Sequence, residues 1–309
     1  MNPVITAAAL AALAPLLAGT AATLAFSGKR KESAAAGLLL HSVDKKPGLS
    51  MSSYSKERFK EFLDYLKTNG IESVTVSQHR EESGRQSVDS GKQDNRNFQL
   101  QVTGCRRIKA KKIAITFDDG LLSFYENAYP LLEERGLKST VFAVAGSVGK
   151  RGNWDVMGRS SHMDARMLRK IAESGHEAAS HSLTHANLVW LDDKELRKEL
   201  CDSKAIIEDI TGTAVKSLSF PFGSWNKRIW EAAKLAGYEY GTVYRGHKHT
   251  PPELLPVMGV YRFDKVSDII NRVFSTSLSS SRALGLIMSH FSKGSPICKF
   301  RKEYKRFPL

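Results

Sequence analysis

Two adjacent acids occupy a position that α/β folds commonly use for chemistry. Asp118 and Asp119 follow the apolar residues 113–117 and precede Gly120. This pattern predicts a buried strand that ends in a sharp turn, with both acids at the carboxyl edge of a sheet. Adjacent side chains on a strand diverge, so we expect one acid to bind a cation and the other to act as a base. The alternative is a turn with two solvated aspartates.

Two histidines point to the same cation. His181 and His185 are four positions apart, a spacing that puts both imidazoles on one face of a helical turn, where they can share a metal ion. Residues 175–180 are predicted to form a short strand, so this pair also follows a strand end. With a strand-end aspartate, the histidines predict a site of two imidazoles and one carboxylate that keeps open positions for water and substrate.

The segments around these residues resemble the first two motifs of the polysaccharide deacetylases, the NodB-homology family (carbohydrate esterase family 4). These motifs are Thr-Phe-Asp-Asp-Gly at residues 116–120 and His-Ser-Leu-Thr-His at residues 181–185. The resemblance spans residues 37–291 and is strongest to the poly-N-acetylglucosamine deacetylase branch. It also includes residues 125–130, 175–177, 220–223 and 287–290.

The resemblance implies a role for each residue of the site. Asp119, His181 and His185 would be the ligands of one divalent cation, which lowers the pKa of water and polarises an acyl oxygen. Asp118 would be the general base, and His290 would be the general acid that protonates the leaving nitrogen. Zinc suits two nitrogens and one oxygen best, although cobalt, nickel, manganese and iron also fit such a site.

The third motif of the family is only partly present. Ser219 stands where typical members carry an arginine that orients the catalytic aspartate. Arg262 is the candidate replacement, and its alternative interpretation is a surface charge at a strand edge. There is no clear Asp-x-x-Asp-Trp fourth motif. These departures bear on specificity and efficiency more than on metal binding.

Four further residues are candidates for the substrate groove. Pro221 and Phe222 belong to the third motif, and the backbone N–H of Phe222 is a candidate oxyanion donor. His41 resembles a histidine that many relatives carry on the first strand, with a structural histidine as the alternative. Trp225 offers a face on which a sugar could stack, with packing in the core as the alternative.

The elements around these motifs alternate between strand and helix from residue 111 onward, which predicts a parallel sheet, open or closed as a barrel. The family resemblance selects an α/β fold: a distorted (β/α) barrel with about seven parallel strands and the site at their carboxyl ends. Residues 55–69 are predicted to form an amphipathic helix, and Asp192 with Glu195 indicates a capping box. Residues 79–110 are polar and aperiodic, which predicts an exposed loop or a disordered insertion.

Composition narrows the possible partners. The 309 residues are enough for one large domain, and the net charge of +14 favours anionic surfaces such as acidic glycans, envelope polymers or lipid head groups. Nucleic acid is the alternative anionic partner, but the sequence contains no zinc-finger, basic-zipper or RNA-binding signature. Cys105, Cys201 and Cys298 lack CxxC spacing, which argues against both a disulfide framework and a thiolate metal site.

The two ends of the chain carry location signals. Residues 1–28 have no charged side chain, which predicts an apolar helix that anchors the chain in a membrane, with a cleaved signal peptide as the alternative. The basic residues 29–31 favour a cytoplasmic domain, whereas a glycan substrate favours an extracytoplasmic one, which we expect. Residues 292–309 form a basic tail, interpreted as a solvated extension or as an electrostatic contact with the envelope.

The leading prediction is therefore a metal-dependent hydrolase. It would remove N-acetyl groups from N-acetylhexosamine residues of an envelope or extracellular polysaccharide and release acetate. An O-acetyl esterase on the same scaffold is the nearest alternative, because the same cation and base would suit esters. A catalytically weak glycan-binding protein is the alternative from another functional class, motivated by Ser219 and the missing fourth motif.

Overall fold

The computed structural model describes residues 37–46, 50–89, 112–151, 161–244 and 250–274. Four predictions lie outside these residues: the apolar helix at 1–28, the rest of the polar insertion at 90–110, the final strand with His290, and the basic tail at 292–309. Within the described part of the chain, no helix is long and apolar enough to cross a membrane.

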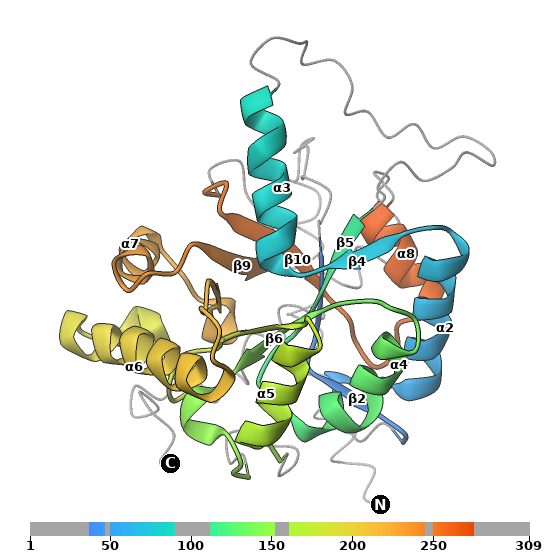
Figure 1. Ribbon diagram of the computed structural model, residues 1–309, viewed down its shortest axis with the longest axis horizontal. Coiled ribbons are helices and arrows are strands. Elements are labelled where there is room, and N and C mark those ends of the chain that lie inside the picture. Colours follow the sequence, from blue (N-terminus) through green and yellow to red (C-terminus); the bar gives the residue numbers. More distant parts are fainter. Residues whose placement is uncertain (1–36, 47–49, 90–111, 152–160, 245–249, 275–309) are drawn as a thin grey trace, which may run out of the picture. The chain divides into compact units, whose positions relative to one another are not determined.

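A closed ring of parallel strands forms the centre of the fold (Figure 1). Its order is β1, β10, β9, β8, β7, β6 and β5, and pairing between β5 and β1 completes the circle. The seven strands are β1 (Gly37–Leu40), β5 (Lys112–Phe117), β6 (Thr140–Ala143), β7 (Glu177–Ser180), β8 (Ser217–Ser219), β9 (Tyr240–Tyr244) and β10 (Leu254–Gly259). The predicted barrel of about seven parallel strands is therefore confirmed.

An eighth strand, β4 (Glu72–Val74), distorts this ring. Ala114 of β5 pairs with both β1 and β4, so these two strands lie on opposite edges of β5. Further along β5, Thr116 and Phe117 pair with β6 on the edge that β4 occupies earlier. Beside the ring, β2 (Ser42–Asp44) and β3 (Ser53–Ser55) form a separate parallel pair.

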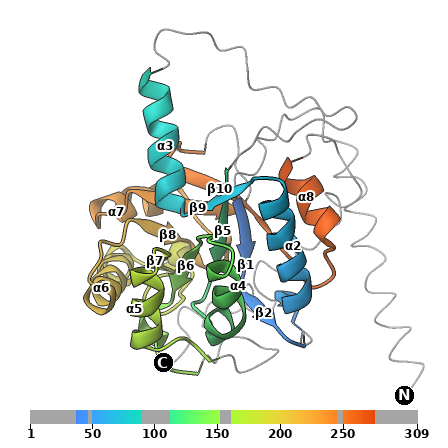
Figure 2. The same cartoon turned by 45° about the vertical axis from the view of Figure 1, so that its right-hand side comes forward.

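Helices surround the ring of strands, and α3 extends away from it (Figures 1 and 2). The α-helices are α2 (Lys56–Thr68), α3 (Val76–Asp89), α4 (Tyr129–Glu133), α5 (Ala165–Glu173), α6 (Asp193–Thr211), α7 (Lys227–Leu235) and α8 (Val266–Phe274). Short helical turns are η1 (Phe124–Ala128), η2 (Ala145–Ser147), η3 (Leu188–Trp190) and η4 (Pro221–Gly223).

Local sequence accounts for the ends of α2 and α6. The side chain of Ser55 accepts a hydrogen bond from Arg58 N at the start of α2, and the buried residues of this helix form its predicted apolar stripe. In α6, the side chain of Asp192 accepts from Glu195 N while the Glu195 carboxylate accepts from Asp192 N. This reciprocal pair is the predicted capping box.

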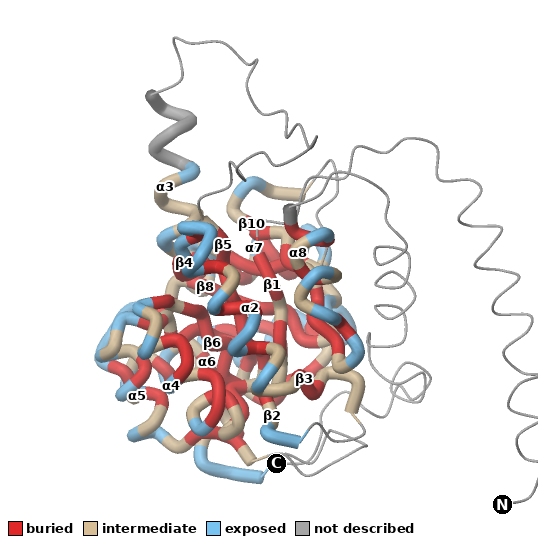
Figure 3. The backbone as a smooth tube through the Cα atoms, turned by 90° about the vertical axis from the view of Figure 1, so that its right-hand side faces the viewer, coloured by how far each residue is buried: buried red, intermediate tan, exposed pale blue. Residues whose placement is uncertain are grey.

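Most residues of the ring strands are buried (Figure 3), and their side chains divide between two apolar clusters. Ile113, Ile115 and Phe117 of β5 belong to the large cluster under the helices. Ala114 of the same strand and Ala179 of β7 belong to the smaller cluster that fills the barrel. This alternation follows from the period of two along a strand, and it determines which side chains face the interior.

One prediction about an element is wrong, and one strand was not predicted. Residues 79–89 belong to helix α3 rather than to a loop, and Arg80 Nη2 and the ion pair of Glu82 with Lys112 tie this helix to β10 and β5. Long-range contacts thus stabilise a segment that has little apolar periodicity. Strand β10 was not predicted, because Pro256 and Gly259 are atypical of a strand.

Candidate active site

Strand alternation directs the site residues into one end of the barrel. Ala114 and Ala179 pack in the interior cluster, so the residues at even spacing beyond them, Asp118 and His181, face the interior at the carboxyl ends of β5 and β7. The backbone N–H of Asp118 donates to Leu40 O at 2.9 Å, which extends the pairing with β1 to the site itself. The barrel register therefore places a carboxylate and an imidazole at the same mouth.

The turn after β5 brings the second acid to this mouth. Asp119 has a φ of 69° and Gly120 a φ of 65°, so the chain leaves the strand in the left-handed region. A Cβ at position 120 would approach the Cα of Ala143 to 3.0 Å, and only glycine fits there. The prediction that the acids diverge is therefore wrong in part: the strand ends at Phe117, and both carboxylates approach His181.

The two histidines lie in a loop rather than on a helical turn, which corrects the sequence interpretation. Ser182 and His185 both have positive φ, and residues 181–187 contain no helix. Hydroxyl groups hold this backbone, because Ser182 N donates to Ser180 Oγ at 3.2 Å and His185 N donates to Ser182 Oγ at 3.1 Å. The four-residue spacing still brings the imidazoles together, with their ring centroids 5.0 Å apart.

A buried carboxylate from α6 fixes the middle of this loop. Glu199 is 1% exposed, and its Oε2 accepts hydrogen bonds from Leu183 N at 3.0 Å and from Thr184 N at 2.9 Å. Its Oε1 accepts from the Thr184 hydroxyl at 2.6 Å. These three bonds hold the segment between the two histidines, so the negative charge of Glu199 is fully engaged in positioning them.

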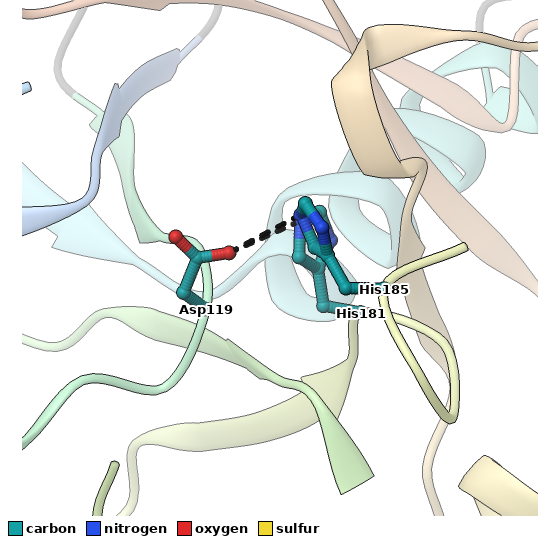
Figure 4. Close-up of side chains that lie close together, drawn as sticks. All are labelled: Asp119, His181 and His185. Atoms are coloured by element: carbon teal, nitrogen blue, oxygen red, sulfur yellow. Dashed lines mark ion pairs between the residues drawn. The ribbon is translucent and has the colours of Figure 1, made fainter. Parts of the chain in front are cut away.

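The three predicted metal ligands converge (Figure 4). Oδ1 of Asp119 lies 3.6 Å from Nε2 of His181 and 3.5 Å from Nε2 of His185. The possible ligand atoms of these residues all lie within 4.8 Å of one another. Nitrogen and oxygen ligands at about 2.0–2.1 Å from a tetrahedral ion are about 3.4 Å apart, so the spacing suits a small divalent cation.

The donor groups also have the chemistry that a cation requires. Oδ1 of Asp119 is buried and has no hydrogen-bond partner among the described residues. Nδ1 of His181 lies 2.9 Å from Ser219 O, and a carbonyl can only accept, so this nitrogen carries the proton and Nε2 presents its lone pair. Burial lowers the pKa of His185 to about 3, which keeps its imidazole neutral. These residues therefore fit a bound divalent cation.

The two acids differ in their electrostatic environment. Burial raises the pKa of Asp118, and the nearby imidazoles of His181 and His41 oppose this shift only in part. Burial also acts to raise the pKa of Asp119, but the neighbouring imidazoles, His185 first, outweigh it and leave that pKa below its usual range. Asp119 is thus the better anionic ligand, and Asp118 the acid whose protonation can change.

Asp118 is held on one side only. The Ser219 hydroxyl donates to its Oδ2 at 3.0 Å, while Oδ1 is buried without a hydrogen-bond partner in the described part of the chain. A buried oxygen without a donor calls for an explanation, and a substrate or water proton supplies one. The geometry is compatible with the predicted general base.

Some of the predicted groove residues lie at the site. Phe222 has a φ of 61°, and its ring packs edge-on against His185 with centroids 4.7 Å apart. Pro221 beside it is buried. Trp225 stacks on Phe220 at 6.1 Å and packs against the core while remaining partly exposed, so core packing and a sugar-facing surface coexist.

Two other predicted residues have different surroundings. His41 lies close enough for its charge to influence the pKa of both acids. The Arg262 guanidinium packs over the Phe263 ring at 5.7 Å, and the hydrogen bond to Asp118 comes from Ser219 instead. The role of Arg262 toward Asp118 stays a prediction, as does that of His290 outside the described residues.

Sequence reasoning missed two residues of this region. Glu199 lies at helical spacing from Leu196 and Ser203 on the buried face of α6, and a charge on an apolar stripe was the available signal.

His162 is the second of these residues. It is buried, its Nδ1 lies 3.1 Å from Lys150 O, and its charge influences the pKa of Asp119. No local pattern distinguishes it, because β-bridge pairing with Leu121 brings it to the site.

Comparison with known proteins finds similarity to one family. The sequence profile of the family described as polysaccharide deacetylase matches residues 106–241. YxkH of Bacillus subtilis, a protein named as a polysaccharide deacetylase, is 25% identical over 204 residues, which are 66% of this chain. The chain spans 62% of the length of that relative, which is less than two thirds.

A second relative and a solved structure extend the comparison. The poly-beta-1,6-N-acetyl-D-glucosamine N-deacetylase of Staphylococcus aureus is 26% identical over 223 residues, covering 69% of this chain and 73% of that protein. The Streptococcus pyogenes deacetylase PplD, solved in complex with acetate, superimposes with a TM-score of 0.62 at 16% identity. The match covers 78% of this chain and 99% of PplD, and it shows a shared fold.

Proposed function

We propose that this protein is a metal-dependent N-deacetylase that removes acetyl groups from N-acetylhexosamine residues of a polysaccharide, because residues 106–241 match the sequence profile of the polysaccharide deacetylase family. The observation that carries the proposal is the convergence of Asp119, His181 and His185 beside Asp118. This arrangement combines a cation site with a carboxylate that has an oxygen available to accept a proton.

Each described residue has a defined task in this proposal. Asp119, His181 and His185 hold one divalent cation, with zinc the best match to two nitrogens and one oxygen. When bound, the cation supplies the positive charge that activates water and polarises the acyl oxygen. Asp118 takes the proton of the attacking water through Oδ1, and its buried position keeps this carboxylate close to the reacting atoms.

The groups around the acyl oxygen and the leaving nitrogen complete the proposal. The left-handed backbone at Phe222 places this residue beside His185, where its N–H is a candidate oxyanion donor. His290 is proposed as the acid that protonates the amine. The sugar itself would lie at the barrel mouth, bordered by Phe222 and Trp225.

The substrate class is proposed from the relatives. The Staphylococcus aureus relative is named for poly-beta-1,6-N-acetyl-D-glucosamine, which makes this polymer the first candidate. A glycan of this kind lies outside the cytoplasm, and we propose an extracytoplasmic catalytic domain for that reason. The high positive charge is compatible with anionic polymers of the envelope.

The decisive experiment measures acetate and free amine together. The full chain is stripped with a chelator, reloaded with zinc or cobalt, and incubated with β-1,6-linked N-acetylglucosamine oligomers. We expect equal amounts of acetate and amine, loss of both with chelator, and recovery on reloading. Release from O-acetylated sugars alone would instead indicate an esterase, and no release from a fully loaded protein would indicate a glycan-binding function.

A further inference from the structure

Ser219 is the residue through which the proposed base and a proposed metal ligand are joined. Its hydroxyl donates to Oδ2 of Asp118 at 3.0 Å, and its backbone carbonyl accepts from Nδ1 of His181 at 2.9 Å. All three residues are at most 4% exposed. The two contacts use different atoms of Ser219, so substitution of the side chain can separate them.

The hydroxyl contact makes the two oxygens of Asp118 unequal. Oδ2 accepts from Ser219 and lies 3.8 Å from Nε2 of His181, whereas Oδ1 is buried and has no hydrogen-bond partner among the residues that the structure describes. A carboxylate that is anchored by one oxygen can present the other in a single orientation. Without the anchor, rotation about the Cβ–Cγ bond would exchange the two oxygens or move both away from the reacting atoms.

The position of Ser219 is itself set by the barrel. Within β8, Ser219 pairs with Thr242 of β9, and Leu218 pairs with Ser180, the residue before His181. The serine therefore lies on a strand between two neighbours, with its side chain in the interior next to the end of β7. A group on a strand with fixed register is a more precise support than a group on a loop.

We propose that Ser219 is a positioning residue that locks Asp118 with Oδ1 toward the attacking water and, through its carbonyl, keeps His181 in the tautomer that binds the cation. This inference rests on the proposed deacetylase function. In it, the hydroxyl group of Ser219 orients the carboxylate of the general base. Ser219 does not touch the substrate or exchange protons with it. Its effect is on the geometry of the base and of the ligand.

The test compares Ser219→Ala and Ser219→Thr with the wild-type, metal-loaded protein. Ser219→Ala removes the hydroxyl but keeps the carbonyl, so we expect kcat to fall about 10- to 100-fold, the effect of one hydrogen bond to a charged group. The KM and the metal dissociation constant should stay within about threefold, because the Nδ1 contact remains. Ser219→Thr retains a hydroxyl and should recover most of the kcat.

Ser217 provides a matched control. It lies two residues earlier on the same strand, it is buried, and its hydroxyl donates to the Glu177 carboxylate at the opposite end of the barrel. Ser217→Ala therefore removes an equivalent hydroxyl–carboxylate bond, and its kcat should equal that of the wild type. A fall in kcat of the same size in both alanine variants would overturn the inference, since it would indicate a general loss of packing.

Two further outcomes separate the inference from the proposed function. Wild-type kcat in Ser219→Ala, with an active wild-type enzyme, overturns the positioning role and leaves the function intact. Absence of any deacetylation by the loaded wild type counts against the function instead. In that case crystal structures of the wild type and Ser219→Ala decide the inference, because an unchanged Asp118 side chain in the variant would refute it.

Discussion

The two ends of the barrel surround their acids differently, although the same strands build both ends. Strand β7 carries Glu177 at its start and leads into His181, and β8 carries Ser217 and Ser219. At the amino-terminal end, Glu177 Oε1 accepts from Ser217 Oγ at 2.5 Å. Its Oε2 accepts from the Thr140 hydroxyl at 2.8 Å and from a backbone N–H of α3 at 3.1 Å.

At the carboxyl-terminal mouth, by comparison, the hydrogen bonding of the acids is incomplete. Asp118 accepts the one hydrogen bond from Ser219, and Oδ1 of Asp118 and Oδ1 of Asp119 have no hydrogen-bond partner among the described residues. Positive φ angles also concentrate there, at Asp119, His185 and Phe222. Buried polar groups without partners and strained backbone reduce stability unless a ligand engages them. One end therefore has the hydrogen bonding of a structural region, whereas the other leaves acceptor atoms open, as the proposed binding of a cation and a substrate requires.

The largest effect is expected from removal of a metal ligand at the mouth. Asp119→Ala deletes the carboxylate that faces both imidazoles, so metal occupancy should fall from about one ion per chain to a small fraction, with loss of nearly all activity. Elemental analysis after buffer exchange measures the occupancy. Full occupancy in this variant would show that the cation, if one binds, lies elsewhere.

Substitution of the neighbouring acid should separate catalysis from metal binding. Asp118→Asn keeps the size of the side chain but removes the base, so the rate should fall on the order of 10²- to 10⁴-fold while the metal stays bound. Single-turnover acetate release and elemental analysis on the same sample test both parts. A variant with activity near that of the wild type would exclude Asp118 as the base.

The loop that carries the histidines offers a smaller, graded effect. Glu199→Leu leaves the donors of Leu183 and Thr184 without acceptors, so metal affinity should fall about 10- to 100-fold, as for other residues that support ligands. Glu199→Gln can still accept from the two backbone N–H groups and should lose less. Isothermal titration with zinc measures both variants.

The control for this loop lies on the same helix. Asp202 of α6 is paired with Lys198 at the surface, with 43% of its side chain exposed. Asp202→Ala should leave metal affinity unchanged. Equal losses in Asp202→Ala and Glu199→Leu would mean that the helix as a whole, and not the Glu199 carboxylate, supports the loop.

The smallest effect on chemistry is expected at the opposite end of the barrel. Glu177→Ala removes the acceptor of three hydrogen bonds, and the unfolding free energy should fall by about 3 kcal/mol because buried donors lose their partner. Metal affinity should not change. Urea unfolding and zinc titration of this variant test the difference between the two ends. A large loss of metal affinity in Glu177→Ala would contradict it.

Much of the fold could be predicted from local patterns. The amphipathic stripe of α2 and the capping box of α6 are interactions between residues that are near in sequence, and their positions are confirmed. The same holds for the apolar strand before Asp118. Helix α3 and strand β10 were missed because their stability comes from contacts with distant strands, which a polar or proline-containing segment does not reveal.

For the site, the sequence alone determined which side chains could hold a cation, because residue type and order within the two motifs carry that chemistry. How these side chains meet depends on contacts between distant parts of the chain. The left-handed turns at Asp119 and His185 aim the ligands, and Glu199 reaches the histidine loop from a helix. Ser219 reaches Asp118 across 101 positions of sequence. Such contacts depend on barrel closure and register, which arise from the pairing of strands far apart in the chain.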